Sequence, residues 1–184
     1  MKVVYFIGLP GCGKSTIIKH FMEGYSGWKS ERPVELLDSH VIGNIRVLGK
    51  YEEGEVFSGT DRLSMAVAPK AIEWISTKPD EVIIGEGDRL NNRGFFEACG
   101  DDLTIIHLYV SDTERKRRYG VRNSNQSDKF IQTVGTKCYN IAKTFGPTQD
   151  LFGYNEGCVI DMNNESLSDT VNIVKFLERK IYNI

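Results

Sequence analysis

Long hydrophobic runs are missing from this chain. Among its 184 residues, no apolar stretch approaches the roughly 18 residues that a membrane-spanning helix requires. Residues 3–7 are apolar and follow Lys2, but the stretch is too short for the hydrophobic region of a secretory signal peptide. We therefore expect a protein that works in the cytoplasm, without a membrane as partner.

Cysteine is scarce, and its spacing carries no motif. The four cysteines lie at positions 12, 99, 138 and 158, with no C-x-x-C pair among them. Zinc ligands and disulfide frameworks both need closer or more regular spacing than this. The sequence therefore predicts reduced thiols and no metal held by cysteine.

An excess of either charge is also absent. The chain carries 23 Lys and Arg against 25 Asp and Glu, which gives a formal net charge of −2. This balance argues against a broadly basic coat for nucleic acid, although it leaves a local basic groove open.

What the chain does have is a complete phosphate-binding loop. Residues 8–15 read G-L-P-G-C-G-K-S, after an apolar stretch over 2–7 that predicts a buried strand and before a helical pattern over 16–22. Backbone N–H groups of such a loop surround phosphate oxygens at a helix N-terminus. The sequence therefore predicts that this loop binds a nucleoside triphosphate, with ATP expected. The residues assigned to nucleotide binding are Gly8, Leu9, Pro10, Gly11, Cys12, Gly13, Lys14, Ser15 and Thr16.

Two side chains of the loop have expected chemical roles. Lys14 is expected to reach the β- and γ-phosphates and to act in catalysis, and the Ser15 hydroxyl is the expected ligand of Mg²⁺.

The rest of the chain alternates between apolar strand candidates and amphipathic helix candidates. Strands are predicted over residues 2–7, 34–37, 81–85, 103–110 and 158–161. Helices are predicted over residues 63–76, 92–99, 113–119, 129–145 and 168–182, with Ser168 as the N-cap of the last helix. Residues 46–61 are expected to form a long loop. This alternation predicts one α/β domain over 1–184, a three-layer kinase-like sandwich with a five-stranded parallel sheet and a small lid at about 112–128.

Carboxylates are expected where two of the predicted strands end. Glu86 and Asp88 follow the strand over 81–85, so either is a candidate for holding Mg²⁺ through a bound water, and Arg89 is a candidate contact to the transferred phosphate. Asp38 follows the strand over 34–37 and is the first candidate for the base that takes the proton of an acceptor hydroxyl. The alternatives are a solvated strand end for Glu86 and Asp88, and an Asx turn for Asp38.

Basic residues are densest over 114–122, directly after the fourth predicted strand. A mobile lid at this place would bring arginines over the phosphates, and Arg118 and Arg122 share a helix face because they are four residues apart. The alternative is an ordinary solvated basic helix face.

The stretch G-T-D-R-L-S-M over 59–65 joins the expected loop to a predicted helix. Asp61 and Arg62 are candidates for contacting the acceptor substrate. The alternative is that Thr60 or Asp61 caps the helix.

Three classes of phosphate-loop protein compete. A regulatory GTPase would carry an N-K-x-D tetrapeptide, which is absent, and a transport or motor ATPase would be longer and carry a partner signature. The length, the single domain and the basic stretch favour a small kinase.

Several segments together resemble the bacteriophage 5-hydroxymethyluridine DNA kinases, which are distant relatives of thymidylate kinase. The resemblance rests on the phosphate loop, D-S-H at 38–40, L-G-K-Y at 48–51, F-S-G-T-D-R-L-S-M at 57–65 and E-G-D-R at 86–89. It implies that ATP phosphorylates the 5-hydroxymethyl group of a modified uracil in viral DNA, a step in thymidine hypermodification. A local cluster of Lys29, Arg32, Arg46, Lys50 and Arg62 would supply positive charge for DNA.

Two other functions remain open at this point. One is a kinase of free nucleosides or nucleoside monophosphates, which would use the same donor site. The other is a nucleotide-binding module that drives the binding of a partner.

Overall fold

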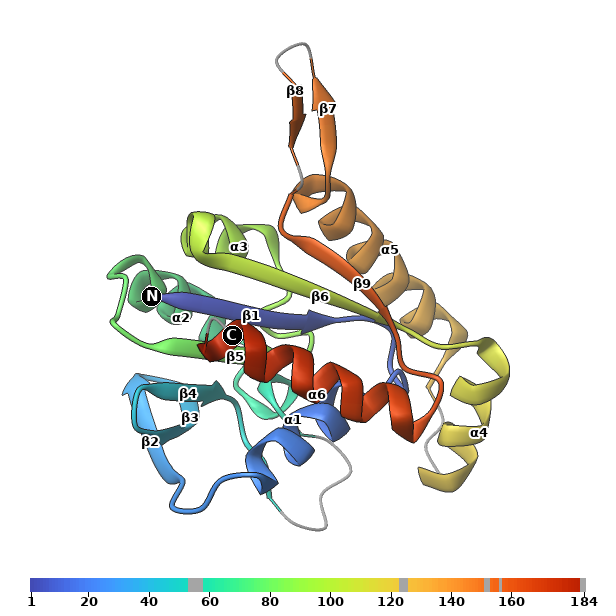
Figure 1. The fold of residues 1–184 in the computed structure, drawn as a ribbon, viewed down its shortest axis with the longest axis horizontal. Helices are drawn as coiled ribbons and strands as arrows, with labels where there is room; N and C mark the ends of the chain where they lie inside the picture. The colour runs from blue at the N-terminus through green and yellow to red at the C-terminus, as the bar shows by residue number, and fades with distance from the viewer. Residues whose placement is uncertain (53–57, 123–125, 151–152, 156, 183–184) are drawn as a thin grey trace.

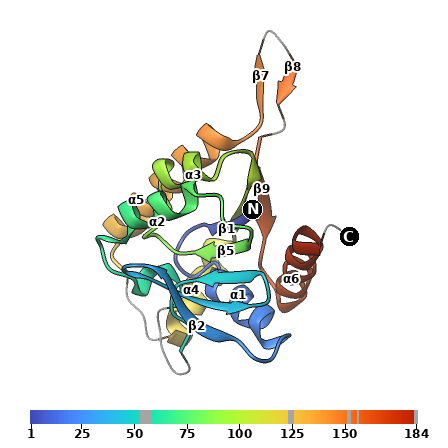
Figure 2. The ribbon, with the colours of Figure 1, turned by 90° about the vertical axis from the view of Figure 1, so that its left-hand side faces the viewer.

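A mostly parallel sheet lies between two layers of helices in the computed structural model of the chain (Figures 1 and 2). The structure describes residues 1–52, 58–122, 126–150, 153–155 and 157–182. Its large sheet has seven strands in the order β2-β3-β4-β5-β1-β6-β9. The predicted α/β sandwich is therefore confirmed.

Five adjacent strands of this sheet run parallel to one another. They are β4 (Ile45–Leu48), β5 (Val82–Glu86), β1 (Lys2–Ile7), β6 (Leu103–Tyr109) and β9 (Val159–Asn163). All five therefore end at the same edge of the sheet, where ligands bind in open α/β folds. Two antiparallel strands, β2 (Lys29–Val34) and β3 (Leu37–Ile42), extend the sheet beyond β4.

Burial on both faces explains why the central strands are continuously apolar. In β1, Val3, Tyr5 and Ile7 pack into one core, and Val4 and Phe6 pack into the other. Helices α2 (Val67–Ser76), α3 (Arg93–Cys99) and α5 (Asp128–Phe145) cover the first core. Helices α1 (Lys14–Glu23) and α6 (Leu167–Tyr182) cover the second. A strand buried on both sides has no polar face to alternate.

The second parallel strand is not where the sequence predicted it. The predicted strand over 34–37 is the turn between β2 and β3, in which Leu36 has a left-handed φ of 68°. The parallel strand is β4, which begins the segment that was expected to be a loop. The apolar pattern of β4 is interrupted by Arg46. This charged residue is buried because its guanidinium donates hydrogen bonds to Glu81, Glu31 and Ser39.

Smaller differences concern the ends of helices and two short elements. Helix α4 covers Asp112–Arg122, longer than the predicted 113–119, and residues 123–125 of the expected lid lie outside the described part of the chain. Short 3₁₀ helices cover Thr60–Arg62 (η1) and Gly100–Asp102 (η2). The hairpin of β7 (Thr148–Asp150) and β8 (Gly153–Asn155), which the sequence analysis missed, projects from the body of the molecule (Figure 1).

Helix α6 begins at Leu167, and its capping residue is Ser166, two residues before the predicted cap. The Ser166 hydroxyl accepts a hydrogen bond from the Asp169 N–H, and the Asp169 carboxylate accepts one from the Ser166 N–H. This reciprocal pair satisfies two N–H groups that the helix leaves open. The predicted cap, Ser168, lies inside the helix and is exposed.

Replacing the true cap tests this assignment. We expect Ser166→Ala to lower the free energy of unfolding by about 1 kcal/mol, because one helix N–H loses its acceptor. Ser168→Ala is the matched control and is expected to leave stability unchanged, as measured by urea unfolding. Equal effects of the two substitutions would contradict the capping assignment.

Candidate active site

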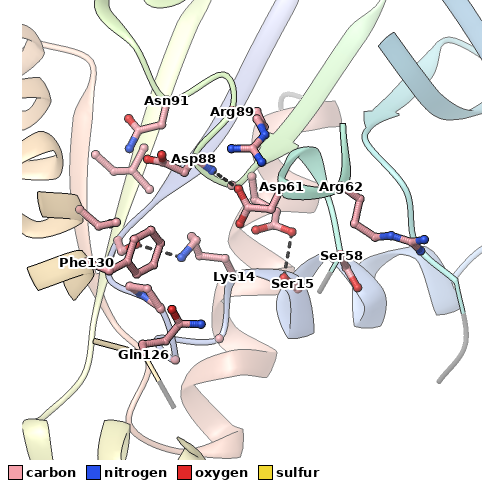
Figure 3. A pocket seen from close by; sticks show the side chains of 18 of the residues that line it. Lys14, Ser15, Ser58, Asp61, Arg62, Asp88, Arg89, Asn91, Gln126 and Phe130 are labelled. Atoms are coloured by element: carbon pink, nitrogen blue, oxygen red, sulfur yellow. Dashed lines mark hydrogen bonds between the residues drawn. The ribbon is translucent and has the colours of Figure 1, made fainter. Parts of the chain in front are cut away.

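A cavity of about 480 Å³ lies at the carboxyl ends of the parallel strands. Its walls come from the phosphate loop after β1, the η1 segment, the residues that follow β5, and the first turns of α5 (Figure 3). Of the predicted site residues with described side chains, the cavity brings together Lys14 and Ser15 with Asp61 and Arg62, and with Glu86, Asp88 and Arg89.

The carbonyl groups of the phosphate loop are bonded by side chains around it. The Lys14 ammonium donates to the carbonyl oxygens of Gly8 and Leu9, at 2.9 and 3.2 Å. The Tyr119 hydroxyl donates to the carbonyl of Pro10 at 2.7 Å.

Two further side chains complete this set. Arg118 donates to the carbonyl of Gly11 at 3.3 Å, and Asn164 donates to that of Cys12 at 2.8 Å. The Cys12 N–H bonds the Leu9 carbonyl within the loop. With the carbonyls of residues 8–12 occupied in this way, the remaining N–H groups of the loop are the backbone groups that can serve an anion, as a phosphate cradle requires.

Glycine at position 13 is required by close packing as well as by backbone shape. Gly13 has a φ of 93°, and a Cβ added to it would lie 2.4 Å from Nδ2 of Asn164. A side chain here would push Asn164 away from the loop. The glycine therefore serves both the left-handed turn and the Asn164 contact.

Lys14 is a buried cation among acidic neighbours. Burial lowers the pKa of its ammonium, but Cys12, Glu86 and Asp61 raise that pKa by more, so it lies above its ordinary value. Lys14 therefore stays protonated at neutral pH. Its charge is available to phosphate oxygens if the side chain turns from the loop carbonyls toward the cavity.

Glu86 is the fully buried carboxylate of the site. Its Oε1 accepts a hydrogen bond from the Ser15 hydroxyl at 2.9 Å, and its Oε2 has no hydrogen-bond partner among the described residues. Burial raises the pKa of Glu86, the nearby Lys14 charge lowers it and Asp61 raises it, to about 7 overall. A carboxylate that is dry and half bonded is well suited to a cation.

The stretches at 59–61 and 86–88 are bonded to each other. The Thr60 hydroxyl donates to the carbonyl of Glu86 at 2.8 Å, and the Asp61 carboxylate accepts the N–H of Asp88. A Cβ on Gly59 would lie 2.1 Å from Glu86 Oε1, so only glycine allows this approach. Thr60 and Asp61 are therefore not the cap of α2, whose N-cap is Ala66.

Asp88 and Arg89 occupy the far wall of the cavity. The Asp88 carboxylate lies 2.8 Å from the Lys137 ammonium on α5, so one of its oxygens is already paired with a cation. Arg89 donates to the carbonyl of Leu63 and lines the cavity beside Asp61 (Figure 3). Glu86 is thus better placed than Asp88 to serve a metal.

Asp38 does not line the cavity. It lies in the antiparallel strand β3, where its carboxylate is 2.6 Å from Arg32 and 3.3 Å from Lys50. Partial burial raises the pKa of Asp38, but these two cations lower it by more, so it falls below its ordinary value. The expectation that Asp38 follows a parallel strand failed because the second parallel strand is β4.

The two lid arginines are only partly placed by the structure. Arg118 bonds the phosphate loop from outside the cavity and is held by Glu114 at 2.7 Å. Arg122 ends α4, and its side chain lies outside the described part of the chain.

Sequence reasoning missed the side chains that support the site. Tyr119 and Asn164 bond the phosphate loop, and Tyr5 donates to the carbonyl of Gly87 at 2.8 Å from within the core. No sequence signal points to these roles, since a tyrosine in an apolar strand and an asparagine in a turn are both ordinary.

The residues present fit a magnesium ion. Within the described ranges, no group of three or more His, Cys, Asp or Glu side chains could hold a metal. Mg²⁺ in nucleotide sites commonly takes one or two protein ligands and fills its remaining positions with phosphates and water. The Ser15 hydroxyl and the half-bonded Glu86 carboxylate match that requirement.

This fold and this cradle define a phosphate-loop phosphotransferase. The model of the family described as P-loop Nucleotide Kinase3 matches residues 1–146. The chain therefore belongs to this family and is a P-loop nucleotide kinase. Membership implies nucleotide binding, typically ATP with Mg²⁺.

Other comparisons find distant likenesses. A search of curated proteins gives no match. A shikimate kinase structure from Bacteroides thetaiotaomicron is 14% identical, with a TM-score of 0.49 over 100% of this chain and 99% of that one. A gluconokinase from Sinorhizobium meliloti is 14% identical, with a TM-score of 0.44 over 96% and 95%. An uncharacterized protein from Eubacterium ventriosum is 12% identical, with a TM-score of 0.43 over 100% and 99%.

Within the described residues, no helix has both the length and the apolar character needed to cross a bilayer.

The raised pKa of Glu86 predicts a pH-dependent stability. The folded state holds this proton up to a pH of about 7, whereas an unfolded glutamate releases it near 4.5. The unfolded state therefore binds fewer protons between these values, and the free energy of unfolding falls as pH rises through this window. The full loss is of the order of 3 kcal/mol.

Urea unfolding at pH 5, 6, 7 and 8 measures this effect. We expect the stability of the wild-type chain to fall relative to Glu86→Gln across the series, because glutamine has no proton to lose. Parallel curves for the two proteins would show that Glu86 does not titrate in this range.

Proposed function

We propose that this kinase transfers the γ-phosphoryl group of ATP to the 5-hydroxymethyl group of 5-hydroxymethyluracil in DNA, a step in thymidine hypermodification. One observation carries the proposal. Two of the stretches that bear the family resemblance, represented by the described residues 58–65 and 86–89, meet beside the phosphate loop, where Thr60 and Asp61 bond the backbone of residues 86–88. Donor and acceptor groups would therefore share one cavity.

The donor end of the cavity binds and orients the triphosphate. The N–H groups of the loop hold the phosphate oxygens, and Lys14 turns from its carbonyl contacts to the β- and γ-phosphates. Ser15 and Glu86 hold Mg²⁺, which supplies charge neutralisation on the phosphates when bound. Arg118 shapes the cradle through Gly11, and Arg122 remains a predicted lid contact.

The acceptor end of the cavity supplies the general base, the group that takes the proton of the acceptor hydroxyl. The acceptor hydroxyl oxygen forms a bond to the γ-phosphorus while the bond from that phosphorus to the β-γ bridging oxygen breaks, and ADP leaves with the electron pair. Asp61 takes the hydroxyl proton, a role that Asp38 cannot fill from its place in β3. Arg89 stabilises the charge on the transferred group, and Arg62 contacts the acceptor.

A nucleobase in duplex DNA must swing out of the stack of bases to reach this cavity. Unstacking costs a few kcal/mol, and less in single strands. A volume of about 480 Å³ lies within the range of small-molecule sites. The cavity is therefore large enough for one extruded base beside the terminal phosphate.

A kinase of free nucleotides is the second candidate, and a charge observation favours it. The cluster of positive charge expected for DNA is largely neutralised in the structure. Arg46 is buried against Glu81, Arg32 and Lys50 share Asp38, and Arg62 lies 2.7 Å from Glu52. Phosphate contacts usually supply much of the affinity for DNA.

Labelled ATP separates the candidates. The protein is incubated with γ-labelled ATP and Mg²⁺, together with hydroxymethyluracil DNA, the same DNA with thymine, or free nucleotides. We expect label in the modified DNA alone, and Lys14→Ala is expected to abolish transfer while retaining the fold.

Label confined to free nucleotides would overturn the DNA proposal. ATP loss without any labelled acceptor would favour a nucleotide-binding module.

The base assignment is tested by a pair of substitutions. We expect Asp61→Asn to lower kcat by about 100-fold, because the amide keeps the hydrogen bond from Asp88 but cannot take a proton. Asp38→Asn is the control and is expected to leave kcat unchanged. The reverse result would return the base role to Asp38.

A further inference from the structure

The acceptor end of the cavity contains a planar, partly apolar wall that the reaction itself does not use. Phe130, in the first turn of α5, lines the cavity with 41% of its surface exposed, and Val134 lies one turn further along the same helix. An aromatic ring that faces a cavity while remaining accessible to solvent is a stacking surface for another planar group.

Asn91 supplies a polar group at the same end. It lines the cavity and is 3% exposed, and its Oδ1 is buried with no hydrogen-bond partner among the described residues. Its Nδ2 donates to the sulfur of Cys138 at 3.8 Å, and sulfur is a weak acceptor. Buried amide oxygens are nearly always bonded, so this one indicates a missing partner.

Two contacts tie the loop that carries Asn91 to the helix that carries Phe130. Lys137 of α5 bonds both the carboxylate and the carbonyl of Asp88, three residues before Asn91. The contact from Asn91 to Cys138 joins the same loop to the same helix. Figure 3 shows Phe130 and Asn91 on the same side of the cavity as Asp88.

We propose that Phe130 and Asn91 form the subsite that selects the base of the acceptor, and that they favour a pyrimidine with an imide edge, such as uracil. The base stacks on Phe130. Asn91 Oδ1 accepts the N3–H of the base, and Nδ2 donates to the neighbouring carbonyl. The inference rests on the proposed function for the identity of the acceptor.

The orientation of the carboxamide makes this recognition selective, because the contact from Nδ2 to the Cys138 sulfur leaves Oδ1 as the atom that meets N3 of the base. Turning Asn91 toward the cavity breaks no hydrogen bond of Oδ1, because that oxygen has none among the described residues. Cytosine presents a lone pair at N3 in place of the N–H, so it would face Oδ1 with two acceptors in opposition. A site built to bond an N–H rejects an analogue that lacks it.

Calorimetric binding tests the subsite without relying on transfer. The probes are two trinucleotides, deoxyadenosine on either side of 5-hydroxymethyluracil or of 5-hydroxymethylcytosine, each titrated into the protein with Mg²⁺ and ADP present. We expect the wild-type chain to bind the uracil probe about tenfold more tightly. Equal affinities, or no binding of either probe, would overturn the proposal.

Substitutions with matched controls assign the residues. Phe130→Ala and Asn91→Leu are each expected to weaken the uracil probe about tenfold and to leave ADP affinity unchanged. Tyr139→Ala removes an aromatic ring that is 66% exposed on the same helix and outside the cavity, and Asn140→Leu removes an exposed amide. Neither control is expected to change probe binding.

The buried position of Asn91 calls for a second variant. Asn91→Asp keeps the size of the side chain and is expected to abolish the preference, because the carboxylate repels the uracil carbonyl that Nδ2 would bond and accepts from the N4–H₂ of cytosine. If the Asn91→Leu variant does not fold, the base preference of Asn91→Asp and of Phe130→Ala decides whether the assignment holds. A uracil preference retained in both would overturn the assignment.

The outcome is separable from that of the proposed function. Selective binding of the uracil probe without transfer of label would sink the proposed reaction and leave the subsite standing. Transfer of label to DNA that does not depend on Phe130 or Asn91 would overturn the subsite and leave the proposed reaction standing.

Discussion

The site depends on occupied backbone carbonyls in one short loop. A phosphate cradle needs N–H groups that face the ligand, and a peptide chain offers a carbonyl for nearly every N–H. Here the carbonyls of residues 8–12 are bonded by Lys14, Tyr119, Arg118 and Asn164. Three of these side chains come from more than 100 residues further along the chain, so the cradle is a product of the whole fold.

A second constraint joins the two halves of the site. Gly59 lets η1 approach Glu86, and Thr60 and Asp61 then bond the backbone that follows β5. Tyr5 supports the same backbone from the central strand, through its bond to Gly87. The carboxylates therefore sit on a turn that is fixed from three directions, which keeps them at a constant distance from the phosphate loop.

The sequence predicted the fold well where its signals were local. The phosphate loop, its strand and helix, and the long helix α5 follow from periodicity and spacing, and Asp61, Arg62 and Glu86 were found because short motifs carry them. The errors arose where a distant partner decides the outcome. Arg46 is buried in β4 because Glu81 and Glu31 meet it, and Asp38 was misplaced as a result. Tyr119 and Asn164 bond the phosphate loop, and only the assembled fold reveals those contacts.

The hydrogen bond from Asn164 to the phosphate loop limits how far the chain could be shortened without disturbing that loop. The family match ends at residue 146, yet strand β9 and the turn that carries Asn164 come after it. A fragment that stops at the family boundary would lose an edge of the parallel sheet and the donor that holds the Cys12 carbonyl. Residues that follow the family match are thus part of the phosphate-binding machinery, through the one amide that Asn164 places against the loop.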